Sequence, residues 1–119
     1  MKLRLLDDTV RFRLTRSEVA SLAAGEPVES VTTLGDGRLG YRLEVADALT
    51  ARLDDGLVVV TVPEDLVGGW SADDGPEGIH GRYGRTSVSV EKDFTCLIPR
   101  PGVDPDDHYP NPKVPRDRT

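Results

Sequence analysis

The sequence predicts a single α+β domain, mostly antiparallel β-structure arranged as a sandwich or a closed barrel, with two short helices and an extended C-terminal tail. Three observations support this prediction. The chain has 119 residues, the size of one compact domain. Apolar and polar residues alternate in several segments, as they do in half-buried strands. The order strand, strand, short helix, strand, strand recurs after about 47 residues, so the domain 1–98 divides into repeated halves, 1–46 and 47–98, before the tail, 99–119.

The first expected element is a hairpin over residues 2–14. Its apolar residues lie on one side of the two strands and its basic residues on the other. The aspartate pair between the strands is typical of a tight turn. Folding the chain about this pair places Leu3 opposite Phe12 and the basic residues opposite one another. One register therefore satisfies the whole apolar side.

A short helix over about 16–24 and a second hairpin are expected next. Thr15 and Glu18 have the spacing of a capping box, in which the hydroxyl accepts a backbone N–H and the carboxylate reaches back. Gly25 is a residue type that commonly ends a helix. Residues 27–45 then form the second hairpin, with a glycine-rich turn.

The second half repeats these elements. The apolar run Leu57–Val62 predicts a strand. Thr61 and Glu64 have the spacing of a second capping box, and the short helix that follows contains Trp70. Residues 78–92 predict the last hairpin.

The last strand carries one charged residue at an apolar position. Val88 and Val90 are followed by Lys92, which a continuous strand would point to the same side. Because burying an unpaired ammonium is costly, either Lys92 has a partner or a β-bulge at residues 91–93 shifts the alternation. We expect the bulge.

Composition and charge exclude several classes of protein. The chain has 15 basic and 21 acidic residues and a net charge of −6, which argues against general affinity for nucleic acid or anionic membranes. The charge is uneven, because residues 1–16 contain five basic and only two acidic side chains. A single cysteine excludes an internal disulfide framework. No apolar run predicts a membrane span or a secretory signal, so we expect a cytoplasmic protein.

The C-terminal residues differ in composition from the rest. Six of the nine prolines follow residue 98, and few apolar residues remain there. Such a segment is expected to be extended, either free or lying as a strap across the domain or across a partner.

A row of basic residues on the first hairpin is the first candidate site. Like charges that face one another destabilise a sheet, so the row needs either an anionic ligand such as a phosphate or nearby carboxylates. The carboxylates that we expect to balance it are Glu44, Glu91 or the aspartates of the tail. The candidate anion-binding residues are Lys2, Arg4, Arg11, Arg13 and Lys92.

Metal binding and nucleophilic catalysis have weaker candidates. Cys96 and His108 would need further ligands to hold zinc. A thiol nucleophile could be Cys96 with His80 or His108 as its base, but Cys96 alternates with apolar residues, as a core residue does. We expect no catalytic residue, no metal and no cofactor. Trp70 and Tyr109 are candidates for contact with a partner, although a single Trp more often packs into the core.

Four segments resemble a family of short, uncharacterised bacterial proteins. They are Met-Lys-Leu-Arg-Leu at 1–5, Val-Arg-Phe-Arg-Leu-Thr-Arg-Ser-Glu-Val at 10–19, Val-Glu-Lys-Asp-Phe-Thr-Cys-Leu at 90–97 and Tyr-Pro-Asn-Pro-Lys at 109–113. The resemblance extends over nearly the whole chain. It implies a stand-alone cytosolic protein and no particular activity.

Two functions are consistent with these features. We expect a non-enzymatic accessory or binding protein that acts through a protein partner, without membrane or nucleic acid, and that can form a homo-oligomer. The alternative is a small barrel that binds an anion such as phosphate, with or without catalysis, through the basic side of the first hairpin. The direction of the basic side chains distinguishes them. Convergence on a cavity indicates a ligand, and outward, ion-paired side chains indicate a structural face.

Overall fold

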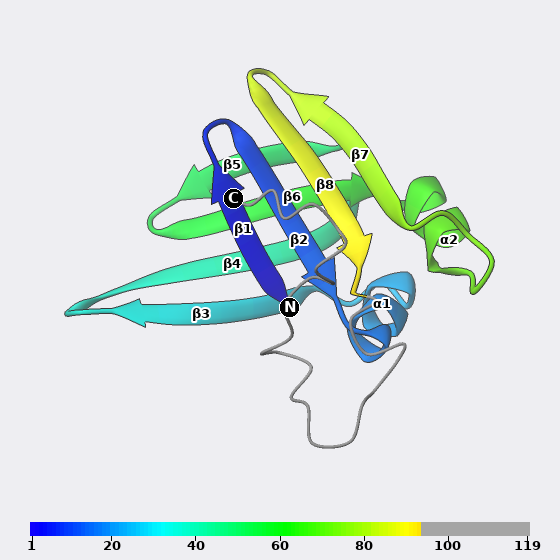
Figure 1. Ribbon diagram of the computed structural model, residues 1–119, viewed down its shortest axis with the longest axis horizontal. Helices are drawn as coiled ribbons and strands as arrows, with labels where there is room; N and C mark the ends of the chain where they lie inside the picture. The colour runs from blue at the N-terminus through cyan, green and yellow to red at the C-terminus, as the bar shows by residue number, and fades with distance from the viewer. Residues whose placement is uncertain (94–119) are drawn as a thin grey trace, which may run out of the picture.

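A computed structural model describes residues 1–93, which fold into eight strands and two helices. The order strand, strand, helix, strand, strand occurs twice, as the alternation of the sequence predicts (Figure 1). The predicted tail, 99–119, lies outside the described residues. The elements are β1 (Lys2–Leu6), β2 (Thr9–Leu14), α1 (Arg16–Ala23), β3 (Val28–Leu34), β4 (Gly37–Ala46), β5 (Thr50–Asp54), β6 (Leu57–Pro63), α2 (Glu64–Ser71), β7 (Gly78–Tyr83) and β8 (Thr86–Lys92).

The strands form two separate four-stranded sheets. The first sheet has the order β1-β2-β8-β7 and the second has the order β3-β4-β6-β5. Each sheet therefore joins one hairpin from each half of the chain, and the two hairpins meet through a parallel pair, β2 with β8 or β4 with β6. The strands of the two sheets cross, and the β3–β4 hairpin extends beyond the first sheet (Figure 1).

This topology corrects one of the predicted alternatives. A closed barrel has no edge strands, whereas β1, β7, β3 and β5 each lie at the edge of a sheet in the described chain. The fold is thus two layered sheets and not a closed barrel. Four of the six strand pairings are antiparallel, and the two parallel pairings were not foreseen.

The register of the first hairpin is confirmed. Leu3 pairs with Phe12, and Arg4 pairs with Arg11. Asp7 in the turn has a φ of 51°, a left-handed conformation that Asp tolerates better than most residues. The alternation of the sequence therefore fixes which side of this hairpin faces the core.

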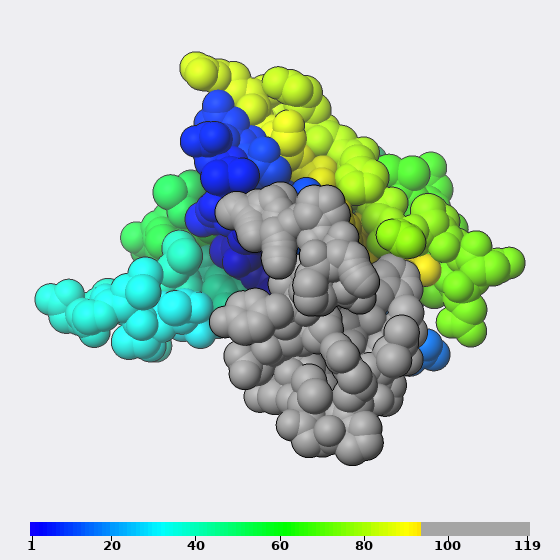
Figure 2. All heavy atoms as spheres, viewed as in Figure 1, coloured from blue at the N-terminus to red at the C-terminus, as the bar shows by residue number. Residues whose placement is uncertain are grey.

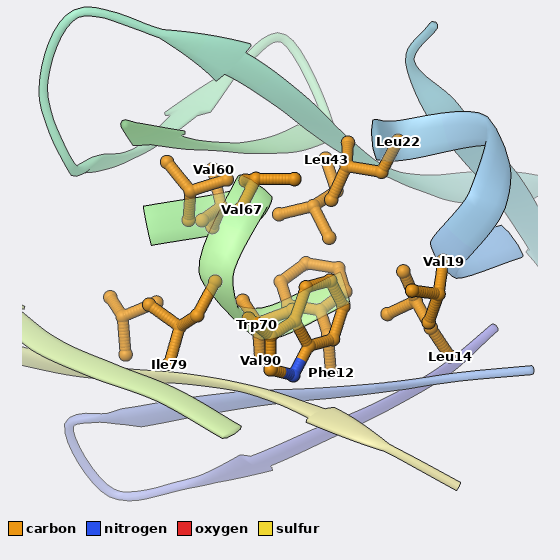
Figure 3. Close-up of a cluster of buried hydrophobic side chains, with 12 residues drawn as sticks. Phe12, Leu14, Val19, Leu22, Leu43, Val60, Val67, Trp70, Ile79 and Val90 are labelled. Carbon is orange, nitrogen blue, oxygen red and sulfur yellow. The ribbon is translucent and has the colours of Figure 1, made fainter. Parts of the chain in front are cut away.

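The core lies between the two sheets. Phe12, Leu14 and Val90 of the first sheet face Leu43 and the strand β6 of the second, and all of these side chains are buried (Figure 3). The two helices contact each other at one end of the layers and add apolar residues to the same cluster. The core members contributed by the helices are Val19, Leu22, Val67 and Trp70.

The two helices begin in different ways. Thr15 accepts a hydrogen bond from the Glu18 N–H, and Glu18 accepts one from the Thr15 N–H, so the first capping box is confirmed. The second is wrong, because α2 begins after Pro63 with no side-chain cap. Thr61 is instead buried in β6, where its hydroxyl donates a hydrogen bond to the Ala48 carbonyl at 2.7 Å. Because α2 begins at Glu64, its N-cap is Pro63 and not Thr61, so Thr61 and Glu64 are not the N-cap and N3 residues that a capping box requires.

The expected bulge near the end of β8 is absent from the described chain. Pairing with β2 continues without interruption as far as Lys92, which lies opposite Leu14. The strand therefore points Lys92 to the same side as Val90, and the ammonium donates a hydrogen bond to the Ala72 carbonyl at 3.0 Å. Ala72 is the C-cap of α2, where a positive charge is favourable. A partner for the charge, and not a shift of the strand, resolves the conflict in the sequence.

Candidate functional site

The outer side of the first sheet carries an excess of basic side chains. Strand residues alternate between the two sides of a sheet. Because Phe12 and Val90 point into the core, their immediate neighbours along β2 and β8 point away from it. Figure 1 views the molecule with this sheet in front, and Figure 2 shows blue atoms of β1–β2 beside yellow atoms of β8 on the same side. We define the basic face by its five cationic residues: Lys2, Arg4, Arg11, Arg13 and Arg82.

One carboxylate lies among these strand residues. Glu91 on β8 is next to Arg13 in the parallel register. One of its oxygens is 3.6 Å from Arg11 Nε, and the other is 3.6 Å from Arg13 Nε. These distances exceed the 2.7–2.9 Å or so of a charge-assisted hydrogen bond, so the contacts are ion pairs only. Consistently, Arg11 Nε is buried without a hydrogen-bond partner.

The other cations of the basic face differ in their contacts. Lys2 Nζ lies 3.3 Å from a carboxylate oxygen of Asp93, just beyond the end of β8. Arg4 and Arg82 are exposed and have no carboxylate within ion-pair distance among residues 1–93. With five cations and Glu91, the outer strand positions of this sheet carry a net charge of +4.

The second sheet provides a direct comparison. Its outer strand positions carry three basic and three acidic side chains, so their charges cancel. At its centre Arg42 lies between two carboxylates, 2.8 Å from Glu44 and 3.7 Å from Glu29. Glu44 therefore neutralises the second sheet, and of the expected carboxylates only Glu91 reaches the basic face within the described chain. The six charged residues are Glu29, Arg38, Arg42, Glu44, Arg52 and Asp54.

Two polar residues on β7 and β8 also lie on the outer side of the first sheet. His80 Nδ1 and Ser89 Oγ are 3.0 Å apart and form a hydrogen bond. Ser89 also pairs with Arg11 in the β2–β8 register. Arg82 of the basic face was not among the residues predicted from the sequence. Its alternation with His80 was a usable signal, but the side it faces depends on the parallel pairing of β2 with β8.

Two of the candidate residues lie elsewhere. Lys92 is on the inner side of the first sheet and caps α2, so it does not belong to the basic face. Trp70 is 1% exposed, and its indole N–H donates to the Glu77 carbonyl at 3.1 Å. The structure thus places Trp70 in the core and offers none of its surface to a partner.

The remaining candidates fall largely outside the described part of the chain. Cys96, His108 and Tyr109 all lie beyond residue 93, so the metal and thiol candidates have no described geometry. Within residues 1–93, His, Cys, Asp and Glu side chains form no cluster of three that could hold a metal ion. Neither helix of this region has the length and apolar character needed to cross a bilayer.

The side chains of the basic face point outward, and three of the five make ion pairs. This is the arrangement expected of a structural face. A purely structural role does not explain the net positive charge of the outer strand positions of this sheet.

Comparison with known proteins identifies the family to which the chain belongs. No curated protein and no solved structure shows significant similarity to the chain. A model of a family of unknown function (DUF7009) matches residues 1–113, and the chain belongs to this family.

Proposed function

We propose that this protein is a non-enzymatic binding protein that recognises an acidic segment of a partner protein through the basic face. One observation carries the proposal: the outer strand positions of the first sheet hold +4, whereas those of the second sheet hold no net charge. Like charges on neighbouring strands destabilise a sheet unless something compensates for them. An acidic partner would supply that compensation.

The shape and charge of the molecule favour a protein as this partner. The cations project from the outer side of a sheet and not into the interior, so they suit an extended acidic surface better than an enclosed small anion. A nucleic acid would place many phosphates near a chain whose net charge is −6, and those outside the basic face would be repelled. Arginine is the suitable cation for carboxylates, because its planar fork can bind both oxygens.

A pair of double variants tests the proposal. Arg4→Gln with Arg82→Gln removes two exposed cations of the basic face that have no described ion pair. Arg38→Gln with Arg52→Gln removes two exposed arginines from the outer side of the second sheet, with the same change in net charge. The probe is a fluorescently labelled ten-residue glutamate peptide, measured by anisotropy at about 100 mM ionic strength, where the Debye length is about 10 Å and charges on the opposite sheet are largely screened.

The first double variant is expected to weaken peptide binding by about tenfold, because two exposed ion pairs are each worth up to about 1 kcal/mol. The second is expected to bind as the unmodified chain does. Equal weakening by both pairs would show that only net charge matters and would overturn the proposal. The proposal would also be overturned if inorganic triphosphate or duplex DNA bound more tightly than the peptide, or if the peptide did not bind.

A further inference from the structure

Glu91 occupies the place on the basic face where a carboxylate of the partner would bind. Its two oxygens face the Nε atoms of Arg11 and Arg13, each at 3.6 Å, and its side chain is 21% exposed. We propose that Glu91 is an internal competitor, which the acidic segment must displace in order to bind. This inference rests on the proposed function and adds a specificity-determining residue to it.

The contacts of Glu91 are suited to displacement. Both are longer than a charge-assisted hydrogen bond, and Arg11 Nε is buried without any hydrogen bond. Arg42 Nε on the second sheet makes no hydrogen bond either, although a Glu44 oxygen lies only 2.8 Å away, so this feature alone does not single out Glu91. The distinction lies in the balance of charge. Arg42 has two carboxylates of its own, whereas Arg11 and Arg13 share one.

A tethered competitor selects for ligands with several charges. Because Glu91 belongs to the same chain, its effective concentration near the arginines is on the order of millimolar or higher. A single free carboxylate at lower concentration only exchanges one charge for an equal one and gains nothing. An acidic segment that displaces Glu91 can also reach Arg4 and Arg82, and these additional contacts offset the loss. Glu91 therefore sets a threshold that favours segments with several closely spaced carboxylates over simple anions.

The test compares two glutamates that occupy corresponding positions. Glu91→Gln and Glu44→Gln each remove one carboxylate next to an arginine on the outer side of a sheet, and each raises the net charge by one. With the same labelled glutamate peptide, Glu91→Gln is expected to lower Kd at least fivefold and Glu44→Gln to leave it unchanged. Thermal unfolding of both variants checks that the fold is retained.

A second background separates competition from simple repulsion. If Glu91 acts by occupying Arg11 and Arg13, then Glu91→Gln gives no gain in affinity when both arginines are already Gln. A gain that persists in that background would show general electrostatic repulsion and would overturn the inference. Peptide binding by the unmodified chain with no gain in Glu91→Gln refutes the role of Glu91 alone, whereas absence of binding in both refutes the proposed function as well.

Discussion

Lys92 offers a test of the two sides of the first sheet. It was a candidate for anion binding, yet it lies on the inner side and donates a hydrogen bond to the Ala72 carbonyl at the C-terminal end of α2. The substitution Lys92→Met keeps most of the aliphatic side chain and removes the ammonium. It is expected to reduce stability and to leave the affinity for the glutamate peptide unchanged.

The expected loss in the free energy of unfolding follows from the hydrogen bond between Lys92 and Ala72. A hydrogen bond that involves a charged group typically contributes about 1.5–3 kcal/mol. Lys92 is only half-buried, and water can hydrate the Ala72 carbonyl after the substitution, so we expect a contribution below this range, about 1 kcal/mol. For a domain of about 100 residues, this loss corresponds to a fall in Tm of about 4–8 °C.

Thermal unfolding followed by circular dichroism measures the loss, with Lys92→Arg as the control that retains the charge and the donors. The control is expected to lose less than half as much stability. Peptide binding is measured on the same samples by anisotropy. The reasoning would be refuted by a Lys92→Met variant with unchanged Tm and a peptide affinity reduced as far as in Arg4→Gln with Arg82→Gln.

Two further predictions concern α2 with the loop that follows it, and the cap of α1. Gly69→Ala is expected to stabilise the protein by about 0.5–1 kcal/mol, because an added Cβ meets open space on α2. Gly75→Ala is expected to destabilise it by about 1–3 kcal/mol, because its Cβ would collide with the Gly69 carbonyl oxygen. Urea unfolding of both variants measures this contrast. For Glu18, burial alone would raise the pKa, but hydrogen bonds from the Met1 amine and the Thr15 N–H hold the pKa below its ordinary value of 4.5. The advantage in stability over Glu18→Gln is therefore expected to be complete well above pH 4.5 and to decrease as the pH falls below it, and a constant difference between pH 7 and pH 3 would contradict this.

The basic face shows how far the sequence alone leads to a candidate site. The alternation of residues 2–14 was sufficient to place four cations on one side of a hairpin and to give their register. It could not show that Glu91 and Arg82 join them, because those residues reach the face only through the parallel pairing of β2 with β8. A parallel pairing between distant segments has no connecting turn whose residue types would signal it.

By itself, the sequence determined the features that depend on near neighbours. These are the first hairpin, the capping box of α1 and the repeated order of elements, because strand alternation and helix capping act over a few residues. Only the tertiary structure decided which hairpins share a sheet, that the sheets remain open, and that Lys92 lies on the inner side of the first sheet, where it donates a hydrogen bond to the end of α2. Those outcomes depend on contacts between the two halves of the chain, where packing of the common core and not local residue preference selects the arrangement.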